Sequence, residues 1–157
     1  MPTTAATTTD NLKTAFAGES QANRKYIAFS QKAQKDGFPN VARLFKAAAE
    51  AETIHALGHL NALGLVGSTA DNLKAAVAGE TYEYKEMYPP MLAQAQQDNH
   101  NAKAMFAFAV KAEEVHANLY AKALQSVETG KDLDAVEVYL CPVCGHLELS
   151  KPSGKCP

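Results

Sequence analysis

Cysteine is absent from the first 140 residues of this 157-residue chain, and the three cysteines that do occur follow in a Cys-x-x-Cys…Cys arrangement. A disulfide framework spread over the fold is therefore excluded, and reduced thiols that bind a metal are expected, as in a cytoplasmic protein. A basic excess is also missing, because the formal net charge is −2 and the lysines are dispersed. A nucleic-acid partner is therefore not expected.

Long apolar runs are missing as well. No run approaches the roughly 20 residues that a membrane-spanning helix needs, so no membrane partner is expected. The opening residues MPTTAATTTD contain neither the basic nor the apolar stretch of a secretory signal. The expected location is the cytoplasm, and the length suits one ordinary domain with a small appendage.

Proline is missing from residues 9–35, which predicts a long first helix capped by Thr8, with Asp10 as an acid in its first turn. A second helix is expected over 39–63, and a third after the cap residue Thr69, with a kink or break at Tyr88-Pro89-Pro90. A fourth is expected over 102–128. Residues 136–140 alternate as a strand does. A four-helix protein with a second small module from residue 134 follows.

The sequence contains one half-site twice. TTDNLKTAFAGE, residues 8–19, returns as TADNLKAAVAGE, residues 69–80, and the offset of 61 residues also carries Glu52-x-x-His55 onto Glu113-x-x-His116. Residues three apart share a helix face, and glutamates on the inner face of an alanine-rich helix are costly unless they bind a cation. We predict a carboxylate-bridged two-metal centre in a four-helix bundle, with iron or manganese favoured over zinc. Its ligands are Glu19, Glu52, His55, Glu80, Glu113 and His116.

The repeat is broken at one position. Glu83 lies three residues after Glu80, whereas its counterpart in the first half is Ala22. The third helix thus offers an additional carboxylate, which could replace His55 on one metal when the charge of that metal changes. The alternative is a surface glutamate within the charged stretch Tyr-Glu-Tyr-Lys-Glu.

Six motifs carry a resemblance to a known family: Ala17-Gly18-Glu19-Ser20, the two Glu-x-x-His pairs, Ala78-Gly79-Glu80-Thr81-Tyr82-Glu83, Met87-Tyr88-Pro89, and Cys141-Pro142-Val143-Cys144-Gly145-His146. The chain resembles rubrerythrins over essentially its whole length. The resemblance implies an all-α, ferritin-like di-iron bundle in residues 1–133 and a small β-rich, rubredoxin-like module in residues 134–157. It implies a peroxidase that reduces hydrogen peroxide to water with electrons from a rubredoxin-type donor.

The resemblance also suggests roles for single residues. Glu83 matches a movable iron ligand, and Tyr26 and Tyr88 match tyrosines whose phenols hydrogen-bond ligand carboxylates. These three side chains are therefore the candidate proton donors. Both tyrosines could instead be ordinary core aromatics.

The cysteine module carries one iron, or a substituted zinc, if it has four ligands. Cys141 and Cys144 form one turn and Cys156 begins a second, but the sequence stops two residues before the expected fourth cysteine. One interpretation is that the sequence ends inside that turn. Others are a three-thiolate site completed by His146, water or another chain, and a redox-active Cys-x-x-Cys.

The short connection between residues 63 and 69 predicts a homodimer. With helices two and three parallel, helix two ends about 12 Å above the metal site and helix three begins about 15 Å below it, at about 1.5 Å per helical residue. The connection must therefore span nearly 30 Å. Residues 64–69 span at most about 20 Å. Either the helix ends unwind, or two chains exchange helix pairs so that Glu19, Glu52 and His55 meet the other ligands across chains. The competing functions are a di-iron oxidase or oxygenase that uses dioxygen, and ferritin-like iron storage.

Overall fold

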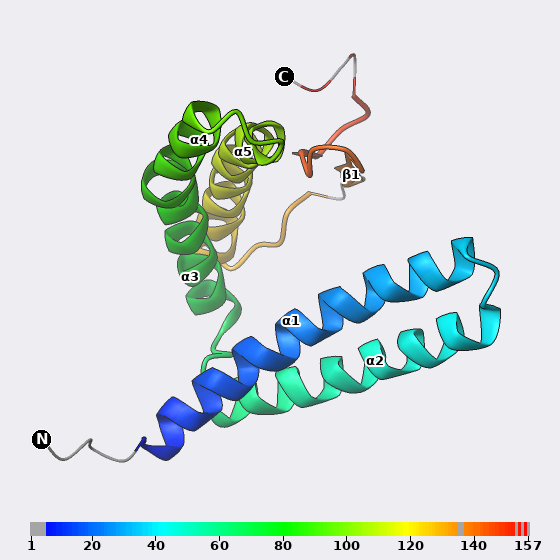
Figure 1. Cartoon of the computed structure of the whole chain (residues 1–157). Coiled ribbons are helices and arrows are strands. Elements are labelled where there is room, and N and C mark those ends of the chain that lie inside the picture. The colour runs from blue at the N-terminus through cyan, green and yellow to red at the C-terminus, as the bar shows by residue number, and fades with distance from the viewer. Residues whose placement is uncertain (1–5, 135–136, 153, 155, 157) are drawn as a thin grey trace, which may run out of the picture. The chain divides into compact units, whose positions relative to one another are not determined.

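A computed structural model describes residues 6–134, 137–152, 154 and 156 of the chain (Figure 1). The protein divides into two compact units, Met1–Val66 and Gly67–Pro157. The first is a helical hairpin, and the second contains another helical hairpin followed by the cysteine-containing tail. The predicted boundary at residue 134 adjoins residues 135–136, which lie outside the described part of the chain.

The first hairpin consists of α1 (Thr8–Lys35) and α2 (Pro39–Ala62). Thr7, rather than the predicted Thr8, caps α1: its hydroxyl accepts a hydrogen bond from the Asp10 amide, and the Asp10 carboxylate accepts one from the Thr7 amide. Gly37 closes the helix at φ 84°, a left-handed conformation that glycine adopts without strain. Proline at the start of α2 then restarts the chain as a helix, since this position needs no amide hydrogen.

The second hairpin is built from α3 (Thr69–Tyr82), η1 (Glu83–Met87), α4 (Tyr88–Gln97) and α5 (Ala102–Glu128). Its cap is Ser68, which lies 61 residues after Thr7, so the repeat extends to the capping residues. The predicted break at Pro89-Pro90 takes an unexpected form. The chain stays helical but widens into the π-helical segment η1, and the prolines begin α4.

The tail forms a small antiparallel pair of strands, β1 (Tyr139–Leu140) and β2 (Leu147–Glu148). The strand predicted over 136–140 is therefore shorter than expected: Glu137 and Val138 are not part of it, and residue 136 lies outside the described residues. Each strand has only two residues, and the tight Cys141–His146 turn connects them.

The interior of both hairpins is made of small side chains. The buried hydrophobic residues in the described part of the chain are all alanines: Ala33, Ala42, Ala49, Ala56, Ala95, Ala109, Ala112 and Ala117. Alanine lets paired helices approach closely, while larger apolar side chains such as Leu44 and Met105 stay exposed. The all-α class with a small β tail is confirmed. Across the described residues, no helix has the length and apolar character needed to cross a membrane.

Candidate metal centre

The first unit brings three predicted ligands together. Glu19 comes from α1, Glu52 and His55 come from α2, and one ligand atom of each lies within 4.8 Å of the others. The His55 Nδ1 is 2.9 Å from the Glu52 Oε2 and 3.9 Å from the Glu19 Oε1. The i, i+3 spacing on α2 places the imidazole and the carboxylate of this pair on one face.

A buried amide holds α1 and α2 in this register. The Asn23 Nδ2, one turn after Glu19, donates to the Ala49 carbonyl at 2.7 Å and to the Thr53 Oγ1 at 2.8 Å. Asn23 is the buried polar residue in the described part of the chain. Because Thr53 follows Glu52 directly, these hydrogen bonds fix the position of one ligand-bearing helix against the other.

The second unit repeats the arrangement. Glu80 from α3 meets Glu113 and His116 from α5, again with one ligand atom of each within 4.8 Å. The His116 Nδ1 is 2.7 Å from the Glu113 Oε2 and 4.0 Å from the Glu80 Oε1. This half-site is the less exposed one, since the His116 side chain is 15% exposed against 55% for His55.

Electrostatic repulsion within the second half-site favours a bound cation. Burial raises the pKa of Glu80, and the nearby charge of Glu113 raises it further. Burial and the Glu113 charge likewise raise the pKa of Glu83. The Glu113 charge thus disfavours ionisation of both Glu80 and Glu83, and a metal ion would offset this repulsion. Oxygen ligands with one imidazole suit iron. The residues present therefore fit a pair of iron ions, one at each half-site.

Glu83 is the first residue of η1 and lies outside the 4.8 Å cluster of Glu80, Glu113 and His116. The π-helical turn itself was not anticipated, although the sequence contains a signal for it. Glu19 and Tyr26 are seven residues apart, whereas Glu80 and Tyr88 are eight apart. A π turn absorbs one inserted residue, so Tyr88 keeps its place on the helix.

Both candidate tyrosines lie among aromatic side chains. The Tyr26 ring is 6.1 Å from that of Phe45, and the Tyr88 ring is 6.0 Å from that of Phe106. Burial raises the pKa of Tyr88, and the charge of Glu83 adds to the effect, so this phenol keeps its proton. Among the described residues of its own hairpin, neither phenol donates a hydrogen bond to a ligand carboxylate. The hydrogen bonds expected of these phenols therefore stay a prediction.

The tail gathers the three cysteines. The Sγ atoms of Cys141, Cys144 and Cys156 lie within 4.8 Å of one another, and His146 is not part of this cluster. The Cys141 carbonyl accepts a hydrogen bond from the Gly145 amide at 3.0 Å, which closes the turn. Hydrogen bonds from the Cys144 and Val143 amides lower the pKa of Cys141 to about 7, which prepares this thiol for a metal.

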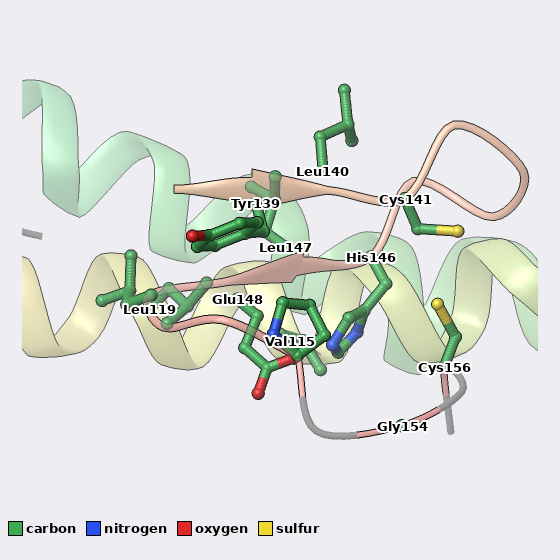
Figure 2. A pocket seen from close by; sticks show the side chains of 12 residues that line it. Val115, Leu119, Tyr139, Leu140, Cys141, His146, Leu147, Glu148, Gly154 and Cys156 are labelled. Carbon is green, nitrogen blue, oxygen red and sulfur yellow. The ribbon is translucent and has the colours of Figure 1, made fainter. Parts of the chain in front are cut away.

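A cavity of about 600 Å³ lies between α5 and the tail (Figure 2). Val115 and Leu119 of α5 line one side, and Cys141, His146 and Cys156 line the other. In Figure 2 the sulfur atoms of Cys141 and Cys156 lie close together at one end of the cavity. The cysteine cluster thus lies beside the helix that carries Glu113 and His116.

Two carboxylate and imidazole half-sites on helical hairpins, with a thiolate cluster beside one of them, define a helical two-metal protein with a separate sulfur-ligated metal site. A sequence profile of the rubrerythrin family matches residues 10–124. Rubrerythrin-2 of Clostridium acetobutylicum is 39% identical over 97% of this chain and 91% of its own. Nigerythrin of Nitratidesulfovibrio vulgaris is 37% identical over 99% of this chain and 83% of its own.

A solved structure titled as the fully reduced, all-ferrous state of nigerythrin aligns with a TM-score of 0.52 and 34% identity, covering 98% of this chain and 82% of that one. The chain belongs to the rubrerythrin family. This membership confirms the ferritin-like fold with a rubredoxin-like tail and the two iron ions as cofactors.

Proposed function

We propose that this protein is a peroxidase that reduces hydrogen peroxide to two molecules of water and so defends the cell against oxidative stress. The reaction consumes two electrons and two protons for each peroxide. The iron pair, when bound by the two half-sites, supplies one electron from each ion. The residues of this chain must then hold the pair and deliver the protons.

The observation that carries the proposal is the third carboxylate beside the second half-site. Burial and the charge of Glu113 raise the pKa of Glu83, so its carboxyl group accepts a proton more readily than an exposed glutamate does. As a neutral acid it donates that proton, and as a carboxylate it becomes an additional ligand. Tyr88 keeps its proton and lies where the charges of Glu83 and Glu113 act on it, so it is the second proposed donor.

Electrons would enter through the cysteine site, with a rubredoxin-type protein as the donor. The proximity of the Cys141, Cys144 and Cys156 thiols supports an iron or zinc ion there, because soft thiolates bind both metals. The three free thiols also support a cytoplasmic location, where cysteines stay reduced.

We further propose a homodimer that exchanges hairpins, and the local structure of the connection supports it. Gly64 closes α2 at φ 67°, and the Leu65 amide donates back to the Leu60 carbonyl at 3.4 Å. At the start of α3, the Gly67 amide donates to the Asn72 Oδ1 at 2.9 Å. Because both helix ends are closed by hydrogen bonds, unwinding them to lengthen the connection would break these contacts.

The apolar surface of the hairpins also supports their pairing. Leu44 is 70% exposed and lies on the face of α2 that carries His55, three helical turns away. Met105 is its counterpart 61 residues later, is 58% exposed, and lies on the face of α5 that carries His116. Pairing two unlike hairpins through these faces would cover both side chains and bring the two half-sites together.

The peroxidase proposal is tested by rapid mixing. The iron-loaded protein is reduced anaerobically and mixed with one equivalent of hydrogen peroxide, and in parallel with dioxygen, while iron oxidation is followed by absorbance. Fast oxidation by peroxide with slow oxidation by dioxygen is expected. The opposite preference would assign the chain to the oxidase or storage class, and particle size would then separate those two.

A further inference from the structure

One hydrogen bond connects the cysteine turn to the second half-site. The Gly145 carbonyl oxygen is 3.0 Å from the His116 Nε2. A carbonyl oxygen only accepts hydrogen bonds, so the Nε2 must carry the proton and donate it. With this proton on Nε2, the Nδ1 is available to a metal ion, and it faces the Glu113 Oε2 at 2.7 Å and the Glu80 Oε1 at 4.0 Å. Two acceptor atoms at 2.7 Å need a proton or a cation between them, and a metal ion held by Nδ1 and the two carboxylates meets that need.

The carbonyl is fixed by the turn that holds the cysteines. Gly145 has φ 81°, and its amide donates to the Cys141 carbonyl at 3.0 Å. In return, the Cys141 amide donates to the His146 carbonyl at 2.9 Å. The direction of the Gly145 carbonyl therefore depends on the same turn that a metal on Cys141 and Cys144 would order.

The equivalent histidine of the first hairpin has no such support. His55 makes the same contact through Nδ1, at 2.9 Å from Glu52. No hydrogen bond to its Nε2 is formed among the described residues of its own unit, and its side chain is 55% exposed. The repeat thus supplies two imidazoles with matching Nδ1 contacts, of which only His116 is also held by a hydrogen bond at Nε2 among the described residues of its own unit.

We propose that the Gly145 carbonyl is a positioning group for His116, and that metal binding at the cysteines strengthens metal binding in the bundle through this contact. The tail then has a second role, distinct from passing electrons. Outer hydrogen bonds to a metal-bound histidine commonly change metal affinity by about 10- to 100-fold. The inference does not depend on the oxidant, so it stands or falls separately from the proposed peroxidase activity.

The first test uses nitrogen NMR of the iron-free full-length protein, labelled with ¹⁵N in histidine. One equivalent of Cd²⁺ fills the cysteine site, because a soft ion prefers thiolates. The Nε2–H proton of His116 should then exchange slowly with water because it is hydrogen-bonded to the Gly145 carbonyl, while the Nε2–H proton of His55 exchanges fast. Equal exchange rates for these two protons would overturn the proposal.

The second test changes the turn. Gly145→Ala forces a side chain onto the left-handed φ, while the space around the new Cβ is open, so only the backbone is disturbed. With Cd²⁺ on the cysteines, we expect this variant to bind one of the two bundle Co²⁺ ions about 10- to 100-fold more weakly and to lose the His116 Nε2–H signal. Unchanged affinity and an unchanged signal would contradict the positioning role.

The matched control is Gly37→Ala, which has nearly the same φ, 84°, and equally open space, but lies in the first hairpin. It should leave the His116 signal and the Co²⁺ affinity as they are. If Gly145→Ala does not fold, the double variant Cys141→Ser/Cys144→Ser decides in its place. It should make the His116 signal insensitive to Cd²⁺, and a Cd²⁺ response that persists would overturn the coupling.

Discussion

Complementation between two defective chains would reveal hairpin exchange directly. The variant His55→Ala damages only the first half-site, and His116→Ala damages only the second. In an exchanged dimer of one chain of each kind, one centre combines both defects and the other combines two intact half-sites. In a dimer without exchange, every centre keeps one defect. Only exchange can therefore create a complete centre from these two chains.

The expected yield follows from random pairing. When equal amounts of the two variants are unfolded and refolded together, about half of the dimers are mixed and each contains one intact centre of two, so about one quarter of all centres are complete. The assay is the mixed-valence electron paramagnetic resonance signal of half-reduced, iron-loaded protein, which requires two coupled irons. Each variant refolded alone should give little of this signal.

The control pairs two defects in the same half-site. Glu52→Ala and His55→Ala both lie in the first hairpin, so every centre of their mixed dimer contains a defect and no signal should return. A mixed-valence signal from this control mixture would refute the exchange. So would the lack of that signal from the His55→Ala and His116→Ala mixture, once its mixed dimer is shown to have formed. A monomer with a complete two-iron centre would refute it as well.

Three further predictions follow from the site and its surface. Glu83→Gln should retain two irons per centre, but peroxide should oxidise them more slowly in a rapid-mixing experiment. The reason is that an amide neither donates an acid proton nor binds iron as a carboxylate does. Unchanged rates would remove Glu83 from the mechanism. Leu44→Ala should weaken the dimer by about 1–2 kcal/mol per site, because the part of this leucine that is exposed in the hairpin would be buried in the dimer. Leu57→Ala should not weaken it, because Leu57 lies about 200° from His55 around α2. Sedimentation equilibrium measures the dimer affinity of both variants. In the metal-free protein, alkylation at increasing pH should modify Cys141 first, with a midpoint at about pH 7, because amide hydrogen bonds stabilise its thiolate. Cys156 should be modified last, because its pKa is raised to about 12. Simultaneous modification of the two would contradict this order.

Much of the fold could be predicted because the decisive signals are local. Gly37 and Gly130 follow α1 and α5 in the left-handed conformation that commonly ends a helix, and the helices α2 and α5 begin at the predicted residues. The caps lie one residue earlier than expected, because the hydroxyls of Thr7 and Ser68 accept hydrogen bonds from the amides of the acids three residues later. The ligands within each half-site could be predicted to meet because the i, i+3 spacing and the alanine-rich contact between the two helices both lie within a single hairpin.

The π-helical segment could not be predicted from the prolines alone. A proline inside a helix normally removes a hydrogen bond and breaks the helix. At Pro89 and Pro90 the chain changes from the π to the α hydrogen-bonding pattern. Some amides have no helical partner at such a change, so proline, which has no amide hydrogen, is tolerated there. The hydrogen bond between His116 and Gly145 is not visible in the sequence either, because it depends on how the tail packs against α5 across 29 residues of chain.

The two features that distinguish the half-sites both belong to the second unit. The inserted residue that widens η1 and the turn that holds Gly145 have no counterpart in the first hairpin. Two first hairpins could also pair and supply six ligands, but their centre would contain neither Glu83 nor an oriented imidazole. Pairing unlike hairpins would instead give every centre one histidine oriented by a hydrogen bond, His116, and one exposed histidine without that bond, His55, with Glu83 as the proposed replacement ligand. An exchange between Glu83 and His55 at one iron therefore requires that each centre contain one hairpin of each kind.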